Sequence, residues 1–218
     1  MISIGSIDMN GTVKIYRLGT FAKRELGNGS NHLVTRETGR VIRERIEREL
    51  QAEKSGVMVA LDFSEAGVID FSCADEIVAK LVSRLLSGEY GDKYLILTGL
   101  NSNHRENLQV ALERKKLAAL VIGNDHSWET LGVLLPYLEE TLKVVMEDGR
   151  ITAKELAQRL SVEVNTSGTR LLNLYKLRLC TRTEEPQAEK GRQFVYTSLA
   201  QGREKGGNHR GLPTLTQP

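Results

Sequence analysis

The sequence predicts two folded domains: an α/β domain over residues 1–123 with a four- or five-stranded mixed sheet, and an α+β domain over residues 149–199. In the first half, apolar runs of strand length alternate with amphipathic helical segments, which indicates strands joined by helical crossovers. Two short helices and a β-hairpin are predicted in the second part. The length of 218 residues also exceeds the ~100–150 residues of a usual single domain.

Strands of the α/β domain are expected where β-prone or apolar side chains run without interruption, because a strand covered on both faces lacks polar alternation. These runs are Thr12–Leu18, Val57–Phe63, Tyr94–Thr98 and Ala119–Ile122. Helices are expected between them, where apolar residues recur at helical spacing. The helical segments lie within Ser30–Leu50, Cys73–Leu86 and His104–Lys116. The many Arg and Glu residues of the first helix predict a solvated face.

A connecting helical segment is predicted over residues 124–148. Its pattern from Trp128 to Met146 is that of a helix which is apolar on several sides and interrupted by Pro136. This apolar surface exceeds what a small neighbouring domain needs, which indicates a contact between domains or a homodimer.

Two helices are predicted in the C-terminal domain. Thr152 and Glu155 place the start of the first near Ala153, since a hydroxyl and a carboxylate three residues apart form a capping box. Its inward face carries Leu156, Ala157 and Leu160. The second helix is expected to begin with Asn165 or Thr166 as its cap.

The second helix divides into a buried side and a polar side. The buried side carries Leu171, Leu174 and Leu177. The polar side carries hydrogen-bonding groups without carboxylates, namely Thr166, Ser167, Thr169, Arg170 and Asn173. Such a surface can enter the major groove of duplex DNA. Residues 179–183 and 192–197, which flank a polar loop, are rich in β-formers and predict a hairpin.

From Leu156 to Arg182 this arrangement resembles the winged helix-turn-helix domains of bacterial transcriptional regulators, over about a quarter of the chain. The resemblance implies double-stranded DNA as the partner, with the polar side of the second helix facing base edges. It also implies phosphate contacts by cations of the wing and the first helix. These cations are Arg182, Lys190, Arg192 and Lys154. Arg178 departs from the pattern, because such domains usually place a glycine before the wing strand.

Charge is distributed unevenly along the chain. Residues 149–218 contain 12 Lys and Arg against 6 Asp and Glu, whereas residues 1–148 contain 18 against 22. A local basic excess is typical of DNA-binding domains, since phosphate neutralisation supplies most non-specific affinity. A solvated surface or a protein-binding module has the same composition, so the charge favours DNA without deciding the matter.

The segments Leu33–Arg40 and Leu61–Val82 are similar to STAS-like domains, relatives of the anti-sigma factor antagonists. This resemblance spans roughly residues 12–122 and implies an α/β domain that receives a signal. In those relatives, a serine that opens a helix after an Asp-Phe strand can be a phosphorylation site for a kinase-like ATPase. Ser72 occupies that place, although Cys73 follows it where the antagonists have glycine. Phosphorylation of Ser72 is therefore one expectation.

A structural role for Ser72 is the alternative expectation. Asp75 lies three residues after Ser72, so hydroxyl and carboxylate fit a capping box that stabilises the helix by ~1 kcal/mol. A phosphate at the same place would face the amides of a helix N-terminus, with repulsion from Asp70 and Asp75.

Catalytic, metal and cofactor sites are not indicated by the sequence. The four histidines form no metal-binding or nucleophile spacing and are expected at the surface. Cys73 and Cys180 belong to no CxxC pair and are expected in the core. The acidic residues around the second strand are expected in turns and caps rather than around a cation. These residues are Asp62, Glu65, Asp70 and Asp75.

The expected function is that of a cytoplasmic bacterial regulator, with a STAS-like input domain and a winged helix that binds DNA. The sequence has neither the ~20-residue apolar stretch of a membrane span nor the pattern of a signal peptide. The alternative is a partner-switching adaptor that binds a kinase-like ATPase or another regulatory protein. An enzyme using the acidic strand end is a third, weaker alternative. The tail over residues 200–218 is rich in Gly and polar residues and is expected to be disordered.

Overall fold

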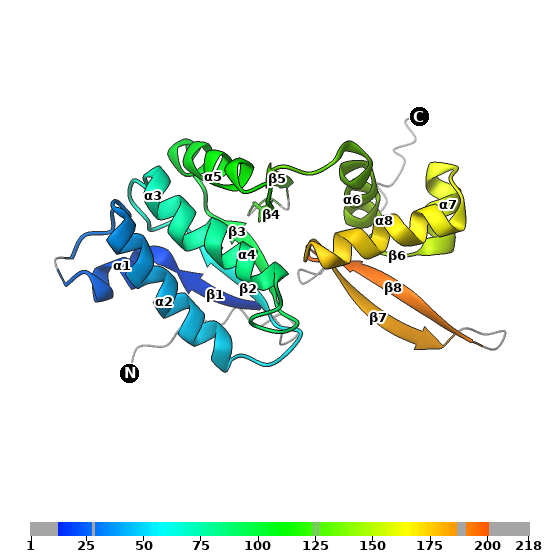
Figure 1. Cartoon of the computed structure of the whole chain (residues 1–218), viewed down its shortest axis with the longest axis horizontal. Helices are drawn as coiled ribbons and strands as arrows, with labels where there is room; N and C mark the ends of the chain where they lie inside the picture. The colour runs from blue at the N-terminus through cyan, green and yellow to red at the C-terminus, as the bar shows by residue number, and fades with distance from the viewer. Residues whose placement is uncertain (1–12, 28, 124, 126, 187–190, 201–218) are drawn as a thin grey trace, which may run out of the picture.

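The computed structural model of this chain describes residues 13–27, 29–123, 125, 127–186 and 191–200. Within them, a five-stranded and a three-stranded sheet form the centres of two lobes that lie side by side in Figure 1. We call the described residues from 13 to 132 the α/β lobe and those from 133 to 200 the C-terminal lobe. Lys190 and the tail over residues 201–218 lie outside the described residues.

The α/β lobe is built on a mixed sheet with the strand order β1-β2-β3-β4-β5. Its strands are β1 (Val13–Arg17), β2 (Met58–Asp62), β3 (Tyr94–Thr98), β4 (Ala118–Ile122) and β5 (Trp128–Gly132). Neighbours from β1 to β4 pair in parallel, and β5 pairs antiparallel with β4. The expected α/β class with a mixed sheet is confirmed, with the fifth strand supplied by β5.

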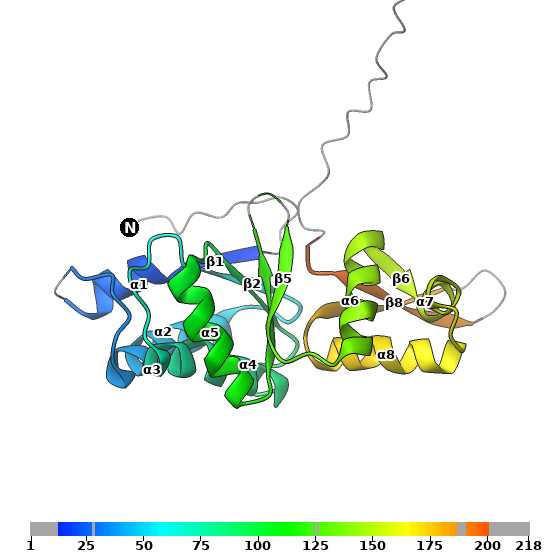
Figure 2. The same ribbon diagram turned by 90° about the horizontal axis from the view of Figure 1, so that it is seen from above.

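Helices cover one face of this sheet, as the view of Figure 2 shows for α2 and α4. They are α1 (Leu18–Glu25), α2 (Arg36–Ala52), α3 (Phe71–Ala74), the π-helical η1 (Asp75–Ala79), α4 (Lys80–Leu86) and α5 (Ser102–Arg114). Val59 and Leu61 of β2 point into the core beneath these helices. Ala60 and Ile96 belong to a second apolar cluster that continues into the C-terminal lobe. The strands therefore lack polar alternation because both of their faces are covered.

The C-terminal lobe packs helices against an antiparallel sheet of order β6-β8-β7. Its elements are α6 (Pro136–Asp148), β6 (Arg150–Thr152), α7 (Ala153–Leu160), α8 (Val164–Lys176), β7 (Cys180–Pro186) and β8 (Arg192–Ser198). Leu142 and Val145 of α6 share one apolar cluster with Leu156 of α7 and Leu171 of α8. Much of the apolar surface of α6 is thus buried in this cluster, which also includes residues of the α/β sheet, whereas Tyr137 at its start stays 39% exposed.

The prediction of one helix from Trp128 to Met146 is wrong. Trp128–Gly132 is an edge strand, because it can complete the backbone hydrogen bonds of β4. Pro136 is the first residue of α6 and does not interrupt it. Proline is tolerated there because the first helical amides have no intrahelical partner.

The prediction of a fully solvated charged face on α2 is also wrong. Arg43 and Glu47 of α2 are buried and form an ion pair of 2.8 Å. Glu76 of η1 is 2% exposed and lies 2.8 Å from Arg36 and 3.5 Å from Arg43. Opposite charges therefore hold α2 against η1 in a place with little access to water.

Both cysteines lie in the core, as expected: Cys73 and Cys180 are buried, and burial raises the pKa of each thiol to about 12. Among the helices of the described residues, none combines the length and the apolar character that crossing a membrane requires.

Candidate nucleic-acid interface

Helix α7 begins as its sequence predicts. The Thr152 hydroxyl accepts a hydrogen bond from the Glu155 amide at 3.3 Å, and the Glu155 carboxylate accepts one from the Thr152 amide at 2.7 Å. The helix ends at Ser161, which has a left-handed φ of 54° and turns the chain toward α8. Helix α8 begins at Val164 after Glu163, so the prediction that Asn165 or Thr166 caps it is wrong.

The inward side of α8 carries Leu171 and Leu174, both fully buried, and also Ser167. The Ser167 hydroxyl lies 2.7 Å from the carbonyl oxygen of Ala153, on α7, and 2.9 Å from that of Val164. The prediction that Ser167 faces DNA bases is therefore wrong. A small hydroxyl at this position allows α7 and α8 to pack closely and satisfies its own hydrogen bonding on backbone carbonyls.

The outward side of α8 forms a shallow hollow of about 440 Å³ together with the start of α6. The hollow is lined by Tyr137, Asn165, Thr166, Thr169, Arg170 and Asn173. The structure thus brings four of the five predicted base-reading residues together. Asn165 was missed, although it lies four residues before Thr169 and so on the same side of a helix. Tyr137 was missed because nothing in the sequence places α6 beside α8.

Arg170 does not extend freely from α8. Its guanidinium lies 2.8 Å from the Glu140 carboxylate of α6 and 5.5 Å from the centre of the Tyr137 ring. The side chain is 18% exposed. A base contact by Arg170 therefore requires that the ion pair with Glu140 opens.

The described wing cations differ in exposure. The Arg182 guanidinium stacks 3.7 Å from the ring centre of Phe194, and the Tyr175 ring centre lies at 5.2 Å. The Arg192 side chain is 75% exposed and lies 3.3 Å from the Glu184 carboxylate. Lys154 is exposed at the start of α7. Arg192 and Lys154 are thus the exposed members among the described cations predicted to contact phosphates.

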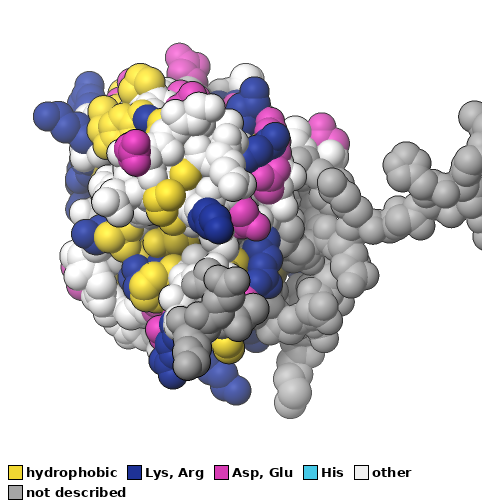
Figure 3. Space-filling view, turned by 90° about the vertical axis from the view of Figure 1, so that its right-hand side faces the viewer, with side chains coloured by type: hydrophobic (Ala, Val, Ile, Leu, Met, Phe, Trp, Pro, Cys, Tyr) yellow, Lys and Arg dark blue, Asp and Glu magenta, His cyan; other side chains and the backbone are white. Residues whose placement is uncertain are grey.

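Ion pairs involve most of the arginines of the C-terminal lobe. The pairs are Arg150–Glu185, Arg159–Asp148, Arg170–Glu140, Arg178–Asp92 and Arg192–Glu184. Figure 3 shows basic and acidic side chains interspersed on this end of the molecule. Within the described part of the chain, Lys154 and Lys176 have no ion-pair partner. Exposed pairs contribute only about 0–1 kcal/mol each, so a phosphate can replace the carboxylate.

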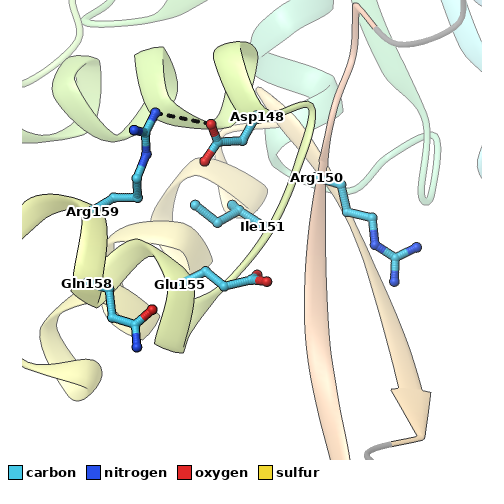
Figure 4. Close-up of a pocket in the computed structure, with 6 residues that line it drawn as sticks. All are labelled: Asp148, Arg150, Ile151, Glu155, Gln158 and Arg159. Carbon is cyan, nitrogen blue, oxygen red and sulfur yellow. Dashed lines mark hydrogen bonds and ion pairs between the residues drawn. The ribbon is translucent and has the colours of Figure 1, made fainter.

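A second hollow, of about 370 Å³, lies where α6 ends and α7 begins (Figure 4). It is lined by Asp148, Arg150, Ile151, Glu155, Gln158 and Arg159. Arg159 lies 3.1 Å from Asp148, and the Glu155 carboxylate is engaged in the capping box. Arg150 pairs with Glu185, which lies outside the lining, so each charged side chain of the hollow has a partner and no uncompensated charge is left to attract an ionic ligand.

Ser72 lies at the second position of α3 and is half-buried. The cap of this helix is Asp70, whose carboxylate accepts a hydrogen bond from the Cys73 amide at 2.7 Å. Asp75 instead pairs with Arg36 at 3.3 Å and with Lys115 at 3.2 Å. The predicted capping box between Ser72 and Asp75 is therefore wrong, and Asp70 is a cap residue as expected.

His104 departs from the expectation of a surface position. It is 1% exposed, its Nε2 lies 2.6 Å from the Gly67 carbonyl oxygen, and it completes a capping box with Asn101. Burial lowers the pKa of His104 below its ordinary value of 6.5. His32 is exposed, whereas His126 and His209 lie outside the described residues. In the ranges that are described, no group of three or more His, Cys, Asp or Glu is placed to hold a metal ion.

A comparison with known protein families and with curated proteins found no match to this sequence.

Proposed function

We propose that this chain is a bacterial-type regulatory protein whose C-terminal lobe is a winged helix-turn-helix that binds duplex DNA. The observation that carries the proposal is the division of α8 into a hidden leucine side and an outward side of hydroxyl, amide and guanidinium groups. The element order supports it, because α6, β6, α7, α8, β7 and β8 follow the sequence of a winged helix. On this view α6 is part of the winged helix rather than a linker.

The α/β lobe is proposed to be a STAS-like input domain. Its support is the mixed sheet with helices on one face and the position of Ser72, half-buried in the first turn of α3. A phosphate on Ser72 would lie near free amides of a helix start but also near the Asp70 carboxylate. The effect of this phosphate on stability is thus the difference between attraction by the amides and repulsion by Asp70.

In the proposed complex, α8 enters the major groove with Thr169 and Asn173 toward base edges. Arg170 joins them when a phosphate or base acceptor replaces Glu140. Lys154 at the start of α7 and Arg192 on the hairpin contact phosphates on either side of the groove. The hydroxyl and amide groups give sequence preference, and the cations give affinity.

We expect Asn173→Ala to reduce affinity for a selected DNA site by about 1–3 kcal/mol while leaving affinity for random duplexes nearly unchanged. Lys154→Ala should instead weaken binding to all sequences and lower the slope of log affinity against log salt by about one unit. Fluorescence anisotropy with labelled duplexes measures both. Lys23→Ala is the matched control, since Lys23 is an exposed lysine of α1 in the other lobe. Equal losses for Lys154→Ala and Lys23→Ala would refute the phosphate contact.

A partner-switching adaptor is the second candidate, and the charge of the C-terminal lobe favours it. In the sequence from residue 133 to residue 200, which includes α6 and omits the tail, 10 Lys and Arg stand against 9 Asp and Glu, a smaller basic excess than that of residues 149–218. The adaptor is correct if the protein binds no duplex at low salt but accepts phosphate on Ser72 from a kinase-like ATPase of the anti-sigma type. Ser72→Ala is the control for the site of that phosphate.

A further inference from the structure

Arginine and aromatic side chains alternate in a row that runs from the α/β lobe to the hairpin of the C-terminal lobe. We call this row the ladder; its members in order are Tyr94, Arg178, Tyr175, Arg182 and Phe194. The guanidinium carbon of Arg178 lies 5.7 Å from the centre of the Tyr94 ring and 5.9 Å from that of Tyr175. Arg182 continues the row between Tyr175 and Phe194, at 5.2 and 3.7 Å. Cations at these distances are attracted by the ring faces.

Asp92 fixes the first part of the ladder to the α/β lobe. Its carboxylate forms an ion pair with Arg178 and accepts a hydrogen bond from the Tyr175 hydroxyl at 3.3 Å. Arg178 also donates to the Gly91 carbonyl oxygen at 3.2 Å. Both partners belong to the turn between α4 and β3. The C-terminal end of α8 is therefore held by charge and hydrogen bonds to the neighbouring lobe.

Apolar residues surround this contact. Leu177 and Leu179, on either side of Arg178, line a narrow seam with Leu85 of α4 and Leu95 of β3. The Arg178 side chain is only 17% exposed, whereas that of Asp92 is 46% exposed. The arginine is thus the buried half of the pair, and the geometry of the seam restricts where its guanidinium can lie.

The backbone of Arg178 supports a dedicated role for its side chain. Its φ is +60°, a left-handed conformation that glycine adopts freely and other residues disfavour. Glycine is the usual residue after a helix at such a position. Arginine is less stable than glycine in this backbone conformation, but its side chain makes the contacts to Asp92, Gly91 and Tyr94 that glycine lacks.

We propose that Arg178 is a positioning residue that sets α8 and the hairpin in a fixed orientation on the α/β lobe. The α3–η1–α4 helical run begins at Phe71, beside Ser72, and ends at Leu86, shortly before the turn that carries Asp92. Along the chain, this run links the surroundings of Ser72 to the turn that contacts Arg178. The fixed orientation is argued from these contacts alone and does not rest on the proposed function.

Arg178→Gly in the full-length chain tests the proposal, because glycine removes the side chain and suits the backbone. We expect a larger maximum dimension in small-angle X-ray scattering and at least ~10-fold faster amide hydrogen exchange in residues 88–94 and 175–182. Lys116→Gly is the matched control, since Lys116 is an exposed residue with a φ of +53° that is not a member of the ladder. Its scattering and its exchange in these two segments should match the wild type.

Asp92→Asn provides the second variant. It should reproduce the effect of Arg178→Gly, and the double variant should add little to either single change, because both break one contact. Wild-type scattering and exchange in Arg178→Gly, or simple additivity in the double variant, overturns the proposal. These readouts need no DNA, so a failure of duplex binding refutes the proposed function and leaves this test intact.

Discussion

Replacing Glu76 by glutamine is expected to lower the free energy of unfolding by about 3–5 kcal/mol, the usual cost of removing one partner from a buried ion pair. The Glu76 side chain is 3% exposed and lies between Arg36, Arg43 and Lys80. Arg36 and Lys80 are open enough to turn toward water, but the Arg43 side chain is 7% exposed. After the substitution, the Arg43 charge therefore stays buried, and Glu47 is the carboxylate left to pair with it.

Urea unfolding followed by circular dichroism measures this loss, with Glu37→Gln as the control. Glu37 is on the same helix as Arg43 and pairs with Arg40 at 2.5 Å, but its side chain is 70% exposed. That pair should contribute at most about 1 kcal/mol. Equal effects of the two substitutions would show that Glu76 is not in a buried network.

The same network predicts a direction of pH dependence. Burial raises the pKa of Glu76, but hydrogen bonds from Lys80 and Arg36 outweigh it, so the pKa lies below the ordinary 4.5. A carboxyl whose pKa is lowered by folding stabilises the protein above its unfolded pKa, and this stabilisation disappears as pH falls through the folded pKa. Glu76→Gln should therefore lose less stability than the wild type on acidification below about pH 4.5.

Leu171→Ala is expected to have the second large effect, a loss of about 2–5 kcal/mol. Leu171 is completely buried where α8 meets the cluster of α6 and α7. Truncation removes apolar contacts and leaves a cavity in that cluster. Leu172→Ala is the neighbouring control, since Leu172 is half-buried and should lose about 1 kcal/mol or less.

Thermal and urea unfolding of the two leucine variants also test the orientation of α8. If Leu172→Ala were as destabilising as Leu171→Ala, the helix would be rotated from the position described. Thr169 and Asn173 would then not face outward, and the proposed DNA-binding surface would lose its basis.

Local patterns were sufficient to predict much of the α/β lobe. The run Tyr94–Thr98 is β3 without change, because an apolar strand-length run has few other ways to be buried. The capping box of Thr152 and Glu155 was also predictable, since both partners lie within one helical turn. By contrast, β5 was missed because its backbone pairs with β4. Its side chains alone do not distinguish an edge strand from a helix.

The candidate site was less predictable where contacts between residues far apart in the sequence determine how a side chain is oriented. Ser167 has the polarity of its outward neighbours, and only the crossing of α7 and α8 turns its hydroxyl inward. Glu140 and Tyr137 confine Arg170 from a helix that precedes it by some thirty residues. Asp70 caps α3 in place of Ser72, because its carboxylate also accepts the Thr35 amide at 2.9 Å. Each of these outcomes depends on a partner that local spacing does not identify.

Binding of the wild-type protein to a random duplex as a function of salt tests the central claim most directly. With Lys154, Arg192 and two or three further cations at phosphates, log affinity should fall against log salt with a slope of about −3 to −5. Anisotropy titrations between about 50 and 200 mM salt cover the range in which that fall is large. Such a slope supports the assignment of α8 and the hairpin to DNA. No binding at the lowest salt, or an affinity independent of salt, would contradict it.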